Sequence, residues 1–442
     1  MQIVRKTKKT EKNSLSILLG EADEFAREGT RINIANPQSM ADGIFGGKYL
    51  TICGQRMLDC SRLDYLGLGS NIEIKKIMKR SIDQNDLGCP ASQIVMKTES
   101  TVSLEKKVAG LHGMDNSIIF TAGYPANENI IQALGLRMNT PHLVPYVRDT
   151  KMGLLSRETP TLFYVNTESH FSIQHGVRLA KAQAPDRCYG WIYKDTEQLR
   201  NMLQKSKSKF NGSPAVRVIA TDTLSSATGR IFDIQELCQI AEEYDCLLYL
   251  DEAHAMGVVG QSGCGVASAL PDFGNYADRC IVMGTLTKAF SHLGGYVALS
   301  NAKLSWFLRF CSPQYIFSAP IPPWMAESLV RTIDFVCGEE GAKARRNLIL
   351  LSEVLKTALE AHGFDLMGSS SHIVPVRIGN EQKADEVKKY LESRGIIASL
   401  FKHPAVPRGE ALIRFSVCTD MTFEEMEEIT SKLVEARETI QF

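Results

Sequence analysis

The chain has 442 residues, of which 44% are hydrophobic, and its 50 basic and 50 acidic side chains cancel. This length and composition allow a large domain with a filled core and a smaller second domain, and they exclude an unfolded or fibrous chain. Because the formal charge is balanced, nothing favours nucleic acid or an anionic membrane as the partner, and a small molecule is expected instead.

The cysteines indicate a reducing compartment, and the hydrophobic runs are too short for a membrane span. The 11 cysteines include no CxxC pair and several lie in apolar runs such as DCLLYL, so neither a disulfide framework nor a metal site is expected. No window reaches the roughly 18 apolar residues that a membrane span requires, and no apolar segment for secretion follows the basic stretch MQIVRKTKKTEKNS. We therefore expect a cytoplasmic protein with a frayed N-terminus and no membrane span.

Between about residues 115 and 300, short apolar runs alternate with amphipathic stretches. In chain order these are NSIIFTAG, ANENIIQALG, AVRVIATD, DIQELCQIAEEYD, CLLYLDEAH and CIVMGTLT. The alternation of strand, loop and helix predicts an α/β fold, a mostly parallel sheet with helices on both faces. Ligands of such sheets bind at the carboxyl ends of the strands, so we expect the functional site at that edge.

From about residue 340 the pattern changes to α+β. The expected elements are GAKARRNLILLSEVLKTALEAHG, HIVPVRIG, ADEVKKYLESRG, ALIRFSVC and TFEEMEEITSKLVEARETI. This change predicts an N-terminal segment at residues 1–60, a large domain at 61–330 and a small C-terminal domain at 331–442.

The stretch LLYLDEAHAMG places two polar side chains at the end of a strand that is too apolar to be exposed. Asp251 directly follows this strand and His254 lies three positions later, so both are expected to face the cleft. A carboxylate is costly there unless a cation or hydrogen-bond donors meet it, although a helix cap or a loop ion pair would also explain it. DEAH also matches a helicase motif, but the phosphate loop GxxxxGK[ST] is absent.

Three further loops carry polar or glycine residues next to predicted strands. Gly123 and Tyr124 precede a helix whose free first-turn amides suit a phosphate. His170 follows the apolar run LFYVN, and Asp222, Ser225 and Ser226 lie in the turn TDTLSSATG. Taken singly, each of these loops also has an ordinary structural explanation.

The stretch GTLTKAFSHLGG at residues 284–295 places a lone amine, Lys288, after the apolar run CIVMG. Following a phosphate cradle, a histidine, a serine-rich loop and Asp251, this lysine completes the set of groups that pyridoxal phosphate requires. The cofactor needs an amine for a Schiff base, an acid near its ring nitrogen, amides and hydroxyls for its phosphate, and a flat group on its ring. We therefore predict that Lys288 is the Schiff-base amine.

Seven motifs between about residues 63 and 420 strengthen this prediction; they are DYLGL, TAGYPANENII, SHFS, DEAHAMGVVGQSGCG, GTLTKAF, IFSAPIPP and PAVPRGEALIRFSV. With these motifs the chain resembles the α-oxoamine synthase family, enzymes that use pyridoxal phosphate to join an amino acid to an acyl thioester. The resemblance implies the fold type I transferase architecture: a mostly parallel central sheet flanked by helices, with a smaller α+β C-terminal domain.

The resemblance also implies a role for each matched catalytic residue. Lys288 would hold the cofactor and then act as general base, Asp251 would pair with the pyridinium nitrogen, and His170 would stack on the ring. Arg414 would form a fork with the carboxylate of the amino acid, a geometry that lysine cannot copy.

The remaining implied contacts are to the phenolic oxygen of the cofactor, from His254 and Ser226, and to its phosphate, from Gly123, Tyr124 and Thr285. Ser318 in IFSAPIPP matches the segment that reaches the phosphate of a neighbouring subunit, which implies a homodimer with a shared site. The implied substrates are an amino acid and an acyl-CoA or acyl-carrier-protein thioester, with loss of carbon dioxide and release of an α-aminoketone. No nucleic acid and no metal are implied.

The sequence departs from the family pattern at two places. Cys89, Pro90 and Ala91 stand where relatives carry glycines, and Leu63 replaces an asparagine before DYLGL. Because of these two changes, the sequence does not decide which amino acid is used or how the acyl chain reaches the site. The stretches PASQIVMKTES and YLESRGIIASLFKHPA are similar to α-hydroxyketone autoinducer synthases, which remain an alternative. A pyridoxal phosphate lyase or aminotransferase is another alternative, whereas Lys288 argues against a non-catalytic partner subunit.

Overall fold

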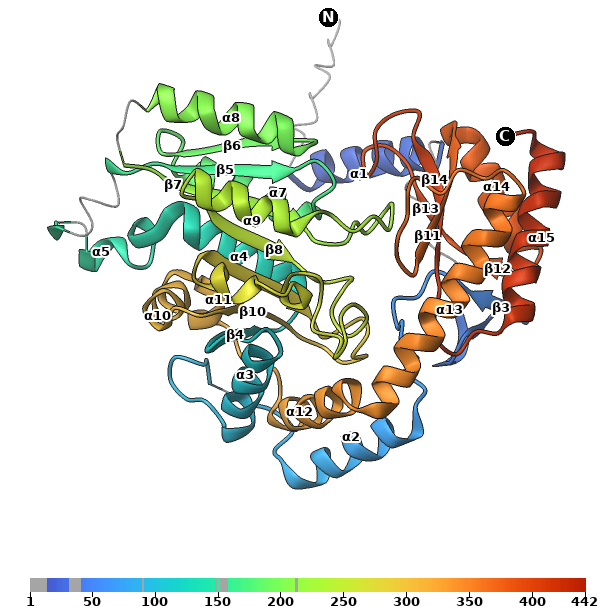
Figure 1. Ribbon diagram of the computed structural model, residues 1–442, viewed down its shortest axis with the longest axis horizontal. Coiled ribbons are helices and arrows are strands. Elements are labelled where there is room, and N and C mark those ends of the chain that lie inside the picture. Colours follow the sequence, from blue (N-terminus) through green and yellow to red (C-terminus); the bar gives the residue numbers. More distant parts are fainter. Residues whose placement is uncertain (1–13, 32–40, 90, 148, 152–157, 211–213) are drawn as a thin grey trace, which may run out of the picture. The chain divides into compact units, whose positions relative to one another are not determined.

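The computed structural model describes residues 14–31, 41–89, 91–147, 149–151, 158–210 and 214–442 (Figure 1). The predicted frayed N-terminus at residues 1–13 and Pro90 lie outside these residues. The chain divides into two compact units, residues 1–45 with 50–56, and residues 46–49 with 57–442. Helix α1 (Ser14–Arg31) belongs to the first unit, and strands β1 (Ala41–Gly46), β2 (Tyr49–Ile52) and β3 (Gln55–Asp59) are divided between the two. The remaining elements belong to the second unit.

A seven-stranded sheet in the order β4-β10-β9-β8-β7-β5-β6 forms the centre of the second unit. Its strands are β4 (Asn116–Phe120), β5 (Thr161–Asn166), β6 (Cys188–Tyr193), β7 (Val216–Asp222), β8 (Leu247–Asp251), β9 (Cys280–Thr285) and β10 (Gly295–Leu299). Five neighbouring strands, β9 to β6, are parallel, and β10 alone runs against its neighbours β4 and β9. The predicted mostly parallel sheet is therefore confirmed.

Helices cover both faces of this sheet, and the alternation of buried side chains along the strands shows why. In β7, Val218 and Ala220 belong to the cluster that includes Ile130 of α4 (Gly123–Leu136), whereas Ile219 packs with Leu237 of α9 (Ile234–Glu243) on the opposite face. Because both faces of such a strand are covered, its sequence is a nearly continuous hydrophobic run, as in AVRVIATD.

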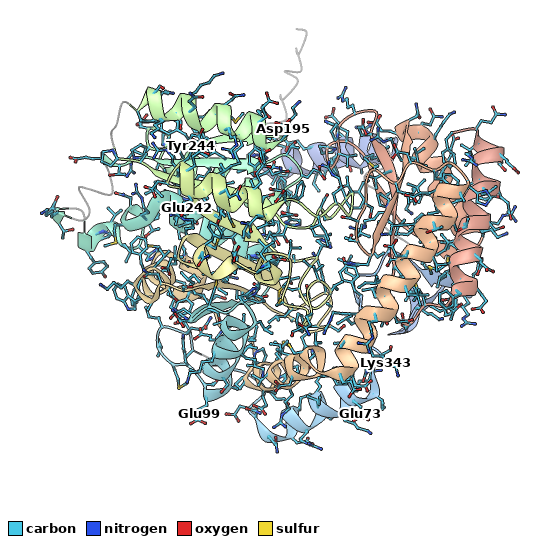
Figure 2. All side chains as sticks on the ribbon, viewed as in Figure 1. Glu73, Glu99, Asp195, Glu242, Tyr244 and Lys343 are labelled. Carbon is cyan, nitrogen blue, oxygen red and sulfur yellow. The ribbon has the colours of Figure 1, made fainter. Side chains whose placement is uncertain are left out.

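The other α-helices that the structure describes before residue 338 are α2 (Ile72–Gln84), α3 (Glu99–Leu111), α5 (Val144–Val147), α7 (Phe171–Gln183), α8 (Thr196–Lys209), α10 (Ala302–Cys311), α11 (Pro313–Phe317) and α12 (Pro323–Cys337). Their starts carry the expected signals: Asp195 caps α8 by accepting from Gln198 N at 2.8 Å, and Glu99 opens α3 (Figure 2). No described helix combines the length and the apolar character that crossing a membrane requires.

The C-terminal part of the chain is α+β, as predicted. Its elements are α13 (Glu339–Ala361), β11 (Ile373–Gly379), α14 (Glu381–Ser393), β12 (Ile396–Ile397), β13 (Ser399–Phe401), β14 (Ala411–Ser416) and α15 (Phe423–Ile440). Strands β11, β14 and β13 form an antiparallel sheet, and its inward side chains Val374 and Ile413 pack with Leu355 of α13 and Leu433 of α15. The division of the chain at residues 60 and 330 remains a proposal.

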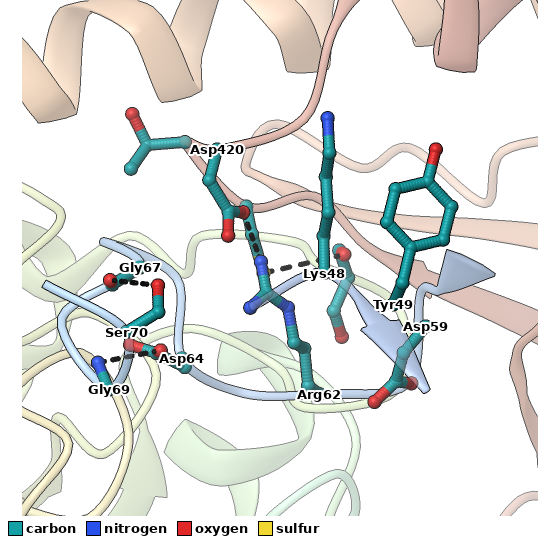
Figure 3. A network of polar contacts seen from close by, with 12 residues as sticks. Lys48, Tyr49, Asp59, Arg62, Asp64, Gly67, Gly69, Ser70 and Asp420 are labelled. Carbon is teal, nitrogen blue, oxygen red and sulfur yellow. Dashed lines mark hydrogen bonds and ion pairs between the residues drawn. The ribbon is translucent and has the colours of Figure 1, made fainter. Parts of the chain in front are cut away.

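The segment at residues 62–69, which contains DYLGL, contacts both the C-terminal part of the chain and the loop after β9. Arg62 forms an ion pair with Asp420, and Asp64 accepts from the amides of Leu68 and Gly69 at 2.9 and 3.0 Å (Figure 3). The Ser291 hydroxyl also donates to Asp64. Since Ser291 N donates to the carbonyl of Lys288 at 2.9 Å, this segment helps to fix the loop that carries the lysine.

A buried carboxyl group, that of Glu252, holds the loop after β8 in place through hydrogen bonds. Glu252 is fully buried, and its oxygens accept from Ala267 N at 2.8 Å and Val266 N at 3.0 Å. Burial raises the pKa of Glu252 to about 7, although these amides oppose the shift. Because the pKa is higher in the folded than in the unfolded chain, the group stabilises the fold below its unfolded pKa and loses this contribution as the pH rises through about 7.

We predict that Glu252→Gln destabilises the protein and that the loss is larger at acidic pH. A glutamine can accept from one of the two amides but turns its NH₂ toward the other, which costs about 1–3 kcal/mol. The wild-type advantage should shrink as the glutamate ionises. Urea unfolding of both proteins at pH 5 and pH 8 measures this difference, and a difference that is constant or grows with pH would contradict the assignment.

Candidate active site

A cavity of about 180 Å³ lies at the carboxyl edge of the sheet, next to the first turn of α4. The structure brings seven of the predicted site residues to its wall: Gly123, Tyr124, His170, Asp251, His254, Thr285 and Lys288. Asn127 and Asp222, which were not among the predicted site residues, also line it. Ser226, Ser318 and Arg414 are not part of this wall.

Lys288 follows β9 and is half-buried, with its Nζ 2.7 Å from Nε2 of His254. Burial lowers the pKa of Lys288 to about 8, against the opposing effect of Asp251 and Asp222. The pKa of His254 is well below its usual value, again because of burial and then because of Lys288. The neutral imidazole therefore accepts from the lysine through Nε2, and its Nδ1 faces the hydroxyl of Tyr65 at 2.7 Å.

We predict that Lys288 becomes reactive at lower pH than an ordinary lysine. Its neutral fraction should rise with a midpoint near pH 8, whereas the exposed Lys343 on α13 serves as the comparison (Figure 2). Reductive methylation of the cofactor-free protein over a pH series, followed by peptide mass spectrometry, measures both rates. Equal pH profiles for the two lysines would contradict the lowered pKa.

Two carboxyl groups stand side by side at the ends of neighbouring strands, because Asp222 of β7 is in register with Asp251 of β8. Asp251 accepts from Asn127 Nδ2 at 2.7 Å and from Ala253 N at 2.9 Å. Asp222 accepts from His170 N at 3.0 Å. Burial, and then the neighbouring Asp251, raise the pKa of Asp222 well above its usual range. The raised pKa favours the protonated form of the Asp222 carboxyl.

A chain of hydrogen bonds joins Asp251 to His170. Tyr249 donates to Oδ1 of Asn127 at 2.8 Å, and Asn127 Nδ2 donates to both Asp251 and Ser172. The Ser172 hydroxyl in turn lies 2.6 Å from Nδ1 of His170, whose pKa burial lowers. Asn127 could have been found from the sequence, since it lies four positions after Gly123 and therefore on the same face of α4.

The start of α4 offers an anion site. No side chain caps this helix, so its first amides are available to a ligand. A Cβ at Gly123 would lie only 3.3 Å from the Thr285 Cβ, and the Thr285 hydroxyl is 2.8 Å from that of Thr287. Tyr124 stands edge-on to His170, with ring centroids 6.1 Å apart. Amides and hydroxyls at this spacing fit a phosphate.

Arg414 lies on β14 and is 6% exposed. It donates to the Ser226 carbonyl at 2.8 Å and to the Ser399 hydroxyl at 3.3 Å, and it stacks over Phe401 at 4.8 Å. Its Nε has no hydrogen-bond partner within the described part of the chain, so the guanidinium has capacity left for a carboxylate. Ser226 contacts Arg414 through its carbonyl oxygen, and its contact with a cofactor remains a proposal.

The cavity as a whole fits pyridoxal phosphate: an amine of lowered pKa, a buried carboxylate at the end of the neighbouring strand, an imidazole on the wall and an uncapped helix start. Residues 57–433 match the model of the family described as aminotransferase class I and II. The chain belongs to this family. The predicted dependence on pyridoxal phosphate is confirmed by this membership, and Lys288, Asp251 and the α4 start are the groups that would hold the cofactor.

Two characterised groups of enzymes have members that resemble the chain over most of its length. It is 30% identical over 384 residues to a serine palmitoyltransferase of Sphingobacterium spiritivorum, covering 87% of each chain. It is also 30% identical over 379 residues to an 8-amino-7-oxononanoate synthase of Thermoanaerobacter pseudethanolicus, covering 85% of this chain and 86% of that one. Both are α-oxoamine synthases, so the predicted membership of that group is confirmed.

A solved serine palmitoyltransferase from S. paucimobilis with bound pyridoxal phosphate and myriocin has the same fold. The two structures superpose with a TM-score of 0.81 at 20% identity, over 97% of this chain and 99% of the other. The expected fold type I architecture is therefore confirmed.

Proposed function

We propose that this protein is a pyridoxal phosphate-dependent C-acyltransferase that condenses an amino acid with an acyl thioester. The products are an α-aminoketone, carbon dioxide and the free thiol carrier. The observation that carries the proposal is the arrangement of Lys288 against His254, with Asp251 at the same edge of the sheet. The relatives support the proposal, because the name serine palmitoyltransferase contains both an amino acid, serine, and an acyl group, palmitoyl.

The bound cofactor supplies an electron sink that stabilises negative charge on the substrate α-carbon. Asp251, whose carboxylate is held by Asn127 and the Ala253 amide, would balance a positive charge on the cofactor ring. Lys288 takes the α-proton on Nζ, and its pKa of about 8 suits a base that works near neutral pH. The α-carbon then bonds to the acyl carbon, and the thiol leaves.

Two groups orient the substrate and the ring. Arg414 uses its free Nε to hold the amino-acid carboxylate until that group is lost as carbon dioxide. His170 covers one face of the cavity and is held in place by Ser172 and by the Asp222 carboxyl. Together these contacts restrict the substrate to one orientation and keep water from the reacting carbon.

The finer parts of the function are also proposed. Ser318 follows α11 and does not line the cavity of its own chain. Its hydroxyl donates to the Ala319 carbonyl at 3.4 Å. We propose that it reaches the phosphate of a partner subunit in a homodimer. We further propose acyl-CoA or an acyl carrier protein as the donor and the cytoplasm as the compartment.

The direct test mixes the cofactor-loaded protein with pooled amino acids and acyl-CoAs. Free thiol should form only when both substrates are present, and mass spectrometry should detect an aminoketone that lacks the carboxyl carbon. Product without an acyl donor would favour a lyase or aminotransferase instead. A hydroxyketone product would favour the autoinducer synthases, and no turnover across the panel would contradict the proposal.

We predict that Arg414→Lys raises KM for the amino acid by about tenfold or more with a smaller change in kcat. Lysine keeps the charge but loses the bidentate fork, which is worth roughly 1.5–3 kcal/mol when a charged group is bonded. Steady-state kinetics with varied amino acid and saturating acyl donor measure the effect. The KM for the acyl donor is the internal control, and an equal rise in both KM values would contradict a carboxylate-binding role.

A further inference from the structure

A second cavity, here named the α13 cavity, lies between α13, the loop after β8 and the segment before β11. Its volume is about 580 Å³, which is within the roughly 300–1,000 Å³ range of small-molecule sites. The residues of its wall that carry the inference are Val258, Val259, Arg346, Ile349, Ser371 and His372. None of them takes part in the reaction proposed above.

His372 supplies an unused hydrogen-bonding group to this wall. It is 3% exposed, and neither ring nitrogen has a hydrogen-bond partner among the residues that the structure describes. Burial lowers its pKa to about 3, so the ring is neutral and offers one donor and one acceptor. A buried polar group without a partner costs about 1–3 kcal/mol, and a ligand with a hydroxyl or carbonyl group would remove this cost.

The rim of the α13 cavity carries a free positive charge. Arg346 is exposed, and its guanidinium forms no ion pair with another described residue. The neighbouring Arg345 is already used, since it donates to the carbonyls of Val336 at 2.6 Å and Gln261 at 2.9 Å and so holds the wall in place. Glu353 is neutralised by Lys356 at 2.5 Å. The unbalanced charge therefore favours an anion.

The rest of the wall is apolar. Val258 is 6% exposed, while Ile349 is 56% exposed and leaves its side chain open to a ligand. From these features we propose that the α13 cavity binds a small hydroxycarboxylate whose carboxylate pairs with Arg346, whose short hydrocarbon chain packs on Val258 and Ile349, and whose hydroxyl bonds to His372.

A ligand in the α13 cavity would change the surroundings of the Lys288 amine through a chain of contacts. The His372 ring packs edge-on against Tyr65, with centroids 4.1 Å apart at 70°. The Tyr65 hydroxyl lies 2.7 Å from His254 Nδ1, and His254 Nε2 lies 2.7 Å from Lys288 Nζ. These three contacts connect the cavity wall with Lys288, so occupancy of the cavity should alter the absorbance of the bound cofactor.

Isothermal titration of the full-length, cofactor-loaded protein with 6-hydroxyhexanoate tests the proposal. We expect saturable one-site binding, together with a change in visible absorbance that gives the same Kd. Hexanoate, which lacks the hydroxyl, and 1,6-hexanediol, which lacks the charge, should each bind more weakly. Because this readout is binding and not turnover, its failure is distinct from failure of the proposed acyltransferase function.

Variants locate the site. Arg346→Ala should raise Kd by about tenfold or more, and Ile349→Trp should abolish binding by filling the cavity. His372→Phe should remove the preference for 6-hydroxyhexanoate over hexanoate. Lys343→Ala, which removes an exposed charge from the same helix outside the cavity wall, should leave Kd unchanged. The absence of saturable binding, equal Kd values for wild type and Arg346→Ala, or binding without an absorbance change would each overturn the proposal.

Discussion

Lys288→Ala should lower kcat by about 10³-fold or more, because the change removes both the amine that holds the cofactor and the base that takes the α-proton. The protein should still fold. Lys288 is half-buried in a loop, and its Nζ forms a hydrogen bond with His254, so the change removes about one hydrogen bond, worth roughly 1 kcal/mol. Turnover and thermal unfolding are measured on the same preparation.

Lys343→Ala serves as the matched control for this experiment. It deletes an exposed amine from α13 and should change neither turnover nor the melting temperature by a measurable amount (Figure 2). Activity of Lys288→Ala within tenfold of wild type would show that the lysine is not catalytic. A variant that does not fold would instead assign it a structural role.

Asp251→Asn is expected to have the second large effect, a fall in kcat of about 10²–10³-fold. The amide is nearly isosteric but carries no charge to balance a cation on the ring. The neighbouring Asp222→Asn should reduce kcat far less, because the raised pKa of Asp222 favours the neutral form of that carboxyl, which the amide resembles. Steady-state kinetics of the two variants, each checked for bound cofactor by absorbance, separate the charge effect from loss of binding.

The comparison of these two aspartates is informative because they are adjacent in the sheet and equally buried, at 3% exposure each. Equal losses in both variants would mean that the carboxyls act as a unit or that the packing at the strand ends is the sensitive feature. A larger loss in Asp222→Asn would reverse the assignment of the charge.

Sequence patterns predicted most of the fold because its elements follow strong local rules. The strand β8 (Leu247–Asp251) covers the apolar run in CLLYLDEAH, and the helix α9 begins and ends within two residues of the bounds of DIQELCQIAEEYD, where Asp233 caps it. The antiparallel direction of β10 was not predicted. It depends on the short connection between β9 and β10, in which Leu286 N donates to the Gly294 carbonyl at 2.9 Å, a contact that is visible only in three dimensions.

The site was predicted where residue type and spacing are both informative. Lys288, Asp251 and His254 stand at strand ends, so the geometry of a parallel sheet brings them together. The residues that were missed act through distant partners: Tyr65 lies 189 positions from His254, and Asn127 lies 124 from Asp251. Tyr65 carries no sequence signal of such a partner, whereas Asn127 is indicated only by its position one turn after Gly123 on α4.

The central claim, that Lys288 holds pyridoxal phosphate, is tested most directly by borohydride reduction of the loaded protein followed by peptide mass spectrometry. Reduction converts the carbon–nitrogen double bond between amine and cofactor into a stable single bond. We predict a pyridoxyl-phosphate mass on the peptide that contains Lys288 and on no other lysine. A modification located elsewhere, or cofactor released unbound after reduction, would contradict the account.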